Sequence, residues 1–112
     1  MAVEVNGATI ATNEKGYLEN VDDWNEDVAH ALAAIEGIEL GERHWDVINY
    51  LREEYFDNHG NQPNTRTIIK AMSEAWGEKV KSSDLYALFP LDPSKQGGKV
   101  AGLPESRRKG GY

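Results

Sequence analysis

The stretch ERHWDVINYLREEYFDNHGNQPNTRTIIKAMSEAW, residues 42–76, predicts two helices joined by a polar connection. Apolar side chains recur at the spacing of one helix face in both halves: Trp45, Ile48, Leu51 and Tyr55 in the first, and Ile68, Ile69, Met72 and Trp76 in the second. Residues 59–64 contain Gly60 and Pro63, which is typical of a turn, and Asn64 suits the N-cap of the second helix. On the first helix, Arg52 is expected to lie away from the apolar stripe.

Before this helix pair, the sequence predicts a small β-structure and one more helix. Side-chain character alternates along residues 3–11, VEVNGATIA, on both sides of Asn6-Gly7. An Asn-Gly pair is the strongest short signal for a β-hairpin. The residues GYL at 16–18 are compatible with a third short strand. A helix over 23–36 is expected next, with Asp23 as its cap and Gly37 at its end.

After the helix pair, two shorter helices are predicted. One begins near Ser82 or Ser83, carries Leu85, Leu88 and Phe89, and is stopped by Pro90. The other runs from Pro93 to Val100, although the pair Gly97-Gly98 weakens it by roughly 1 kcal/mol per glycine. The fold class is therefore α+β: a short N-terminal antiparallel β-meander packed on an array of about five helices. Residues 1–102 are expected to form one domain and 103–112 a flexible basic arm.

Composition limits the class of protein and its chemistry. The chain of 112 residues has no cysteine, which excludes disulfides, thiolate nucleophiles and persulfide carriage. No apolar run approaches the roughly 18 residues of a membrane span, and no signal-peptide pattern is present, so the expected location is the cytoplasm. Residues 95–112 hold five basic side chains and one acidic one, a net charge of +4. The net charge of the whole chain is −7, so the net charge of residues 1–94 is −11. This acidic charge disfavours broad nucleic-acid binding.

The residues that could act in catalysis or bind a metal do not form a recognised motif. His30, His44 and His59 have no spacing that makes a metal-binding helix face, and the three tryptophans, Trp24, Trp45 and Trp76, fall on apolar faces typical of a core. The serines lack a nucleophile-elbow context. The sequence therefore indicates neither a metal nor a cofactor.

The predicted pair of helices also allows a DNA-binding interpretation. If the pair is a helix-turn-helix, the second helix would present Arg66 and Lys70 to DNA. The basic cluster 107–109 would add to the binding. The simpler interpretation is a bundle corner with two solvated cations, and Glu74 and the acidic body favour it.

Several blocks in one order resemble the DsrC/TusE family: HWDVINYLREEYFDNHG at 44–60, TRTIIKAM at 65–72, LYALFP at 85–90 and PSKQGGKVAGLP at 93–104. The likeness extends over essentially the whole chain. It implies a β-meander against helices with a mobile C-terminal arm that typically ends K-Q-A-C-x-x-A-G-L-P-K-P-T-G-C-V. It also implies that the penultimate cysteine carries sulfur as a persulfide. The implied partners are siroheme sulfite reductase, a membrane-bound thiol–disulfide reductase and a sulfur-transferring complex that feeds tRNA thiolation.

This sequence departs from the family at both reactive positions. Gly98 stands where the first arm cysteine would be, and Gly111 stands where the carrier cysteine would be, after an insertion of two residues. Sulfur relay requires a thiolate that attacks and leaves, and glycine has no side chain. We therefore expect no enzyme or carrier activity from this chain, whatever label the family carries.

Three functions remain open at this point. The first is a non-catalytic relative that docks on sulfite reductase or sulfurtransferase proteins through a surface formed by Lys95, Gln96, Lys99, Arg107, Arg108 and Lys109. The second is a DNA-binding regulator of sulfur metabolism. The third is a stable paralogue with no present chemistry.

Overall fold

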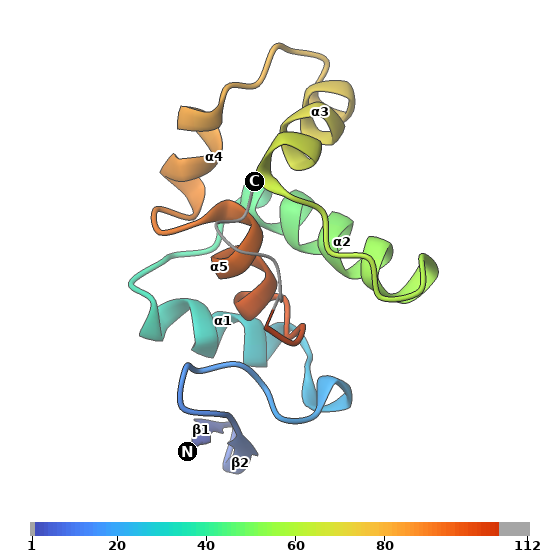
Figure 1. The fold of residues 1–112 in the computed structure, drawn as a ribbon. Helices are drawn as coiled ribbons and strands as arrows, with labels where there is room; N and C mark the ends of the chain where they lie inside the picture. The colour runs from blue at the N-terminus through green and yellow to red at the C-terminus, as the bar shows by residue number, and fades with distance from the viewer. Residues whose placement is uncertain (1, 106–112) are drawn as a thin grey trace.

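The computed structural model describes residues 2–105, and within them a two-stranded hairpin precedes five α-helices (Figure 1). The elements are β1 (Ala2–Val5), β2 (Ala8–Ala11), α1 (Glu26–Ile35), α2 (Glu42–Asp57), α3 (Thr65–Trp76), α4 (Ser82–Leu88) and α5 (Pro93–Val100). The predicted α+β class is confirmed. No helix among the described residues is long and apolar enough to cross a membrane.

The hairpin forms where the Asn6-Gly7 pair predicted it. Both residues have positive φ, 51° and 83°, as a type I′ turn requires. The strands pair antiparallel with Val3 opposite Ile10. The expected third strand is reduced to one isolated bridge between Thr12 and Leu18, so the predicted meander is a hairpin with a single further pairing.

The start of α1 differs from the prediction. A short 3₁₀ helix occupies Val21–Asp23, and α1 begins only at Glu26. Asn25, not Asp23, is the N-cap, since its side chain accepts a hydrogen bond from the Val28 backbone N–H at 2.9 Å. Either residue type can cap a helix, so the position was decided by the preceding turn and not by the residue preference.

The two helices of the 42–76 stretch form as predicted. Asn64 caps α3 by accepting from the Thr67 backbone N–H at 2.9 Å. Gly77 ends α3 in the left-handed region, with φ +64°.

Helix α5 lies at the centre of the helical array and contacts α1, α2, α3 and α4 (Figure 1). Its N-cap Asp92 accepts from the backbone N–H groups of Ser94 and Lys95, and Pro93 occupies the first turn, where no N–H is needed. Gly97 permits a close approach to α2, because a Cβ there would lie only 3.1 Å from Cδ1 of Leu51. A helix weakened by two glycines is thus stabilised by burial, as expected when packing dominates over propensity.

Candidate functional site

The end of α5 is a complete Schellman motif that turns the chain toward its C-terminus. The Leu103 N–H donates to the Gly98 carbonyl at 3.0 Å, and the Gly102 N–H donates to the Lys99 carbonyl at 3.1 Å. Gly102 is in the left-handed region, with φ +76°. The direction in which the chain leaves α5 is therefore set by local backbone hydrogen bonds.

A tryptophan packs directly on this turn. A Cβ at Gly102 would lie 2.3 Å from Cδ1 of Trp24, well inside van der Waals contact, so only glycine fits. The Trp24 indole N–H donates to the Val100 carbonyl at 2.9 Å. Trp24 is thus a packing residue with a satisfied indole, as predicted. Its predicted place on a helix face is wrong, because Trp24 lies in extended backbone between the 3₁₀ helix and α1.

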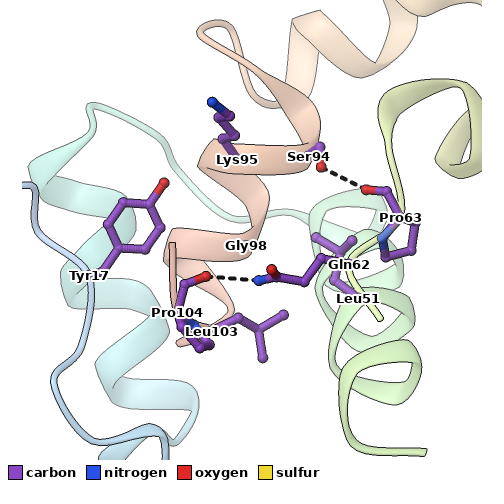
Figure 2. Close-up of a pocket in the computed structure, with 9 residues that line it drawn as sticks. All are labelled: Tyr17, Leu51, Gln62, Pro63, Ser94, Lys95, Gly98, Leu103 and Pro104. Atoms are coloured by element: carbon purple, nitrogen blue, oxygen red, sulfur yellow. Dashed lines mark hydrogen bonds between the residues drawn. The ribbon is translucent and has the colours of Figure 1, made fainter. Parts of the chain in front are cut away.

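Two further side chains bind the carbonyls of the same segment. The Arg52 guanidinium donates to the Ala101 carbonyl at 2.7 Å and lies 3.9 Å from the centroid of the Trp24 ring. The Gln62 amide donates to the Pro104 carbonyl at 2.8 Å (Figure 2). We call Trp24, Arg52 and Gln62 the carbonyl clamp.

The clamp corrects the prediction for Arg52. Its side chain was expected to point to solvent, but it is half-buried, and burial lowers the pKa of its guanidinium. The helical spacing contained a signal for this, because position 52 is four residues after Ile48 and borders the stripe formed with Leu51. No comparable pattern marks Gln62, which lies in the connection between α2 and α3.

The described start of the predicted arm lies against the body. Leu103 is 1% exposed, and the Glu105 carboxylate pairs with the Lys15 ammonium at 2.9 Å. The predicted arm residues Arg107, Arg108, Lys109 and Gly111 lie outside the described residues.

Gly98, which the sequence resemblance matches to the family's first arm cysteine, borders a small cavity of about 10 Å³ beside the clamp. Figure 2 shows the lining residues: Tyr17, Leu51, Gln62, Pro63, Ser94, Lys95, Gly98, Leu103 and Pro104. This volume is near the minimum for one water molecule. A Cβ at Gly98 would meet no atom within 4 Å, so the fold has room for a side chain that the sequence does not supply.

The phenol of Tyr17 lies beside this cavity. Burial raises the pKa of its phenol to about 12, helped by the negative charges of Glu105, Asp92 and Glu36. The Lys99 ammonium lies 5.1 Å from the ring centroid. At neutral pH the phenol is protonated, so Tyr17 can donate a hydrogen bond but is a poor nucleophile.

The three predicted docking residues on α5 lie in different environments. Gln96 is 4% exposed and is used internally, because its amide accepts from the Leu91 N–H and donates to the Glu36 carboxylate. The Lys99 ammonium also faces Glu36, at 3.5 Å. The Lys95 side chain is half-buried at the rim of the cavity and points outward in Figure 2. Of the two lysines, Lys95 is therefore the one whose ammonium points outward, whereas that of Lys99 faces Glu36.

The predicted DNA-contacting residues, Arg66 and Lys70, are both exposed on α3, one turn apart. The connection before them, residues 58–64, is longer than the three- to four-residue turn of a DNA-binding helix-turn-helix. Glu74 continues the same face one turn further on.

The histidines lie apart from one another in packing roles or on the surface. His44 accepts from the Gly41 N–H through Nδ1 and faces the Leu88 carbonyl through Nε2, which indicates the tautomer protonated at Nε2. Burial lowers its pKa, opposed by the contact with Leu88. His30 stacks edge-on against Trp45, and His59 lies exposed in the turn after α2. Within residues 2–105, no three acidic or histidine side chains are grouped to hold a metal ion.

The family follows from comparison with known proteins. A family model described as "DsrC like protein" matches residues 4–108. The chain belongs to the DsrC family. The match includes Gly98 and the whole clamp and ends before Gly111.

Relatives within the DsrC family support this assignment over nearly the full length. "Sulfurtransferase TusE" from Sodalis glossinidius is 44% identical over 104 residues, which cover 92% of this chain and 95% of the relative. "Sulfurtransferase TusE" from Salmonella typhimurium is 45% identical over 100 residues, with 88% and 91% covered.

Solved structures of the DsrC family share the fold. DsrC from Allochromatium vinosum superposes with a TM-score of 0.86 at 41% identity, with 96% of each chain covered. The oxidised gamma-subunit of dissimilatory sulfite reductase from Archaeoglobus fulgidus superposes with a TM-score of 0.86 at 34% identity, with 96% of this chain and 98% of that chain covered. The clamp and the Gly98 cavity are thus parts of a DsrC-type scaffold that here has no cysteine.

Proposed function

We propose that this chain is a non-catalytic member of the DsrC family that binds the partners of thiol-bearing members without accepting sulfur from them. The partners would be sulfite reductase or sulfurtransferase-type proteins. Its effect would be to occupy their docking sites and so to regulate or compete with the sulfur carriers.

The observation that carries this proposal is the carbonyl clamp around an emptied reactive position. Three side chains from separate parts of the chain bind the carbonyls of Val100, Ala101 and Pro104. These contacts orient the base of the arm, while glycine stands at the positions of both arm cysteines, 98 and 111, in the sequence. A surface that is held in place but has no nucleophile can bind but cannot relay sulfur.

The names of the relatives point to sulfur transfer, and the composition of this chain opposes that activity. No cysteine occurs anywhere in the 112 residues. The hydroxyl groups of serine and of Tyr17 do not replace it, because their alkoxide or phenolate forms are scarcely populated at neutral pH.

A binding and competition experiment tests the proposal. Purified chain is titrated against purified siroheme sulfite reductase and against a purified TusE-feeding sulfurtransferase complex. Sulfur transfer to a cysteine-bearing DsrC-type protein is then measured with and without an excess of this chain. We expect saturable binding to at least one of the two and inhibition of its sulfur transfer; absence of binding to both would refute the proposal.

Two charge variants test whether binding uses the surface around Lys95. Lys95→Glu reverses the outward charge beside Gly98 and should weaken binding by about tenfold or more, as for a charge at a docking interface. Lys79→Glu makes the same change on an exposed residue between α3 and α4 and should leave binding unchanged.

DNA binding through Arg66 and Lys70 stays the second candidate, motivated by their exposure on consecutive turns of α3. It predicts a mobility shift with duplex DNA at about 50 mM salt, with an affinity that falls as salt increases. A shift that survives the change Arg66→Gln/Lys70→Gln would contradict this reading of the two residues.

A further inference from the structure

A second surface lies between α2 and α3, which form the right-hand part of Figure 1. It is an open groove of about 580 Å³, lined by Asp46, Asn49, Tyr50, Glu53, Ala71, Met72, Glu74, Ala75 and Trp76. Leu51 of α2 faces α5 at Gly97, whereas Glu53 is rotated by about 160° from it at 100° per residue. The groove therefore faces away from the carbonyl clamp.

The floor of the groove is apolar and adaptable. Met72 is 3% exposed, and the rings of Tyr50 and Trp76 are half-buried beside it. Ala71 and Ala75 lie one turn apart on α3 and leave space above this floor. Methionine and aromatic side chains of this kind suit the seating of an apolar side chain from a partner.

Two side chains of α2 fix the orientation of Trp76 on α3. Its indole N–H donates to the Asp46 carboxylate at 2.7 Å. The Arg43 guanidinium lies 4.2 Å from the centroid of its ring and is itself paired with Glu78. The Trp76 ring is therefore held in place before a partner binds, which reduces the entropy lost on binding.

The charged residues that line the groove are all acidic, and the Arg43 guanidinium over the Trp76 ring is paired with Glu78. Asp46, Glu53 and Glu74 are carboxylates, and none of its lining residues is basic. The charge of −11 on residues 1–94 adds a field of the same sign. An occupant that places cations at Glu53 and Glu74 is favoured, and an acidic one is repelled.

We propose that this groove binds a short basic peptide segment of a partner protein, with one large apolar side chain on Trp76 and Met72 and with Lys or Arg side chains at Glu53 and Glu74. This is the helix-in-groove or extended-segment mode of peptide recognition. It goes beyond the function proposed above, because it gives the protein a second docking surface, on the side of α2 away from the arm.

The proposed occupant is a segment of another protein. Pro104 is tied to Gln62 on the α5 side of α2. The chain's own basic triplet, 107–109, lies outside the described residues, and its presence in the groove is an outcome that the experiment below distinguishes.

The test uses the full chain labelled with ¹⁵N and a synthetic 14-residue amphipathic peptide of Lys and Leu with one Phe. We expect the largest chemical-shift changes at groove residues of α2 and α3, and weaker binding at higher salt. Glu53→Gln/Glu74→Gln should weaken binding by between about threefold and tenfold. Glu14→Gln/Glu39→Gln, which removes the same charge from exposed sites elsewhere, should leave it within about twofold.

Other outcomes would overturn the proposal. Shifts spread evenly over the acidic surface, or equal losses in the two double variants, would mean non-specific attraction. If neutralising Arg107, Arg108 and Lys109 to Gln moves the groove signals without peptide, the chain's own arm occupies the groove. The variants Glu53→Gln/Glu74→Gln should still bind sulfite reductase or sulfurtransferase through the surface around Lys95. Failure of the groove proposal is therefore distinguishable from failure of the proposed function.

Discussion

Two glycines four residues apart, Gly98 and Gly102, lie in opposite environments. At Gly102 the backbone is left-handed and Trp24 fills the space where a side chain would begin. At Gly98 the backbone is helical and the space beside it is empty. One glycine is required by the fold and the other is merely permitted.

The difference lies in what surrounds each glycine. Around Gly102 the structure has the Schellman turn, the contact with Trp24 and the carbonyl clamp. Beside Gly98 the space is open. The proposed binding role uses both features, because the turn is held in place while position 98 carries no nucleophile.

The largest expected effect comes from Gly102→Ala. The left-handed backbone costs an alanine roughly 1–2 kcal/mol, and displacement of Trp24 adds an overpacking term of similar size. We expect a loss of about 3 kcal/mol or more in the free energy of unfolding, measured by urea titration. Gly77→Ala is the matched control, since Gly77 is also left-handed but has open space at its Cβ. Equal losses in the two variants would remove the special role of Trp24.

The next effect tests the clamp itself. Arg52→Met keeps an aliphatic stem but removes the hydrogen bond to Ala101 and the contact with the Trp24 ring. A charged hydrogen bond and a cation–π contact together predict a loss of about 2 kcal/mol. Arg66→Met, at an exposed site on α3, should change stability by less than about 0.5 kcal/mol. A loss no greater than that of Arg66→Met would show that the clamp is dispensable.

Position 98 should tolerate a side chain, and a side chain there should increase the stability of the fold. Gly98→Ala adds a methyl group in open space within a helix and should stabilise by up to about 1 kcal/mol. Gly97→Ala makes the same change where Leu51 is 3.1 Å away, so part or all of that gain should be lost to crowding. Thermal unfolding of the two variants side by side measures the difference. A destabilised Gly98→Ala would contradict the open space at this position.

The smallest effect is confined to alkaline pH. The pKa of Tyr17 is raised to about 12 in the fold from about 10 in the unfolded chain. Its contribution to stability is therefore complete below pH 10 and is lost as pH rises from 10 to 12, because the unfolded chain ionises first. Tyr17→Phe should show a shallower loss of stability across that range, and absorbance titration should lack one late-ionising phenol. Identical pH profiles for the two proteins would contradict the burial of this phenol.

Much of the fold was predictable because its signals are local. The Asn6-Gly7 turn, the Asn64 cap and the bounds of α3 and α5 depend on residues within one turn of each other. The start of α1 was predicted two to three residues early, because Asp23 and Asn25 are both acceptable caps and the 3₁₀ helix before them decided between the two.

The candidate site was predictable only in part. Its location followed from the resemblance of residues 93–104 to a sulfur-carrying family, and the absence of cysteine followed from composition. The roles of Arg52 and Gln62 did not follow, because their partners are 49 and 42 residues away in the chain. Spacing along one helix says which side chains share a face, but not which other element covers that face.

The sequence by itself determined the family, the order of the elements and the absence of any thiol, since a cysteine is either encoded or absent. Only the tertiary structure decided that Gly102 is obligatory and Gly98 is not, and that α2 and α3 enclose an acidic groove with an apolar floor. These properties arise where separate elements meet. The free volume beside a backbone atom depends on the neighbours that packing brings there, and those neighbours are distant in the sequence.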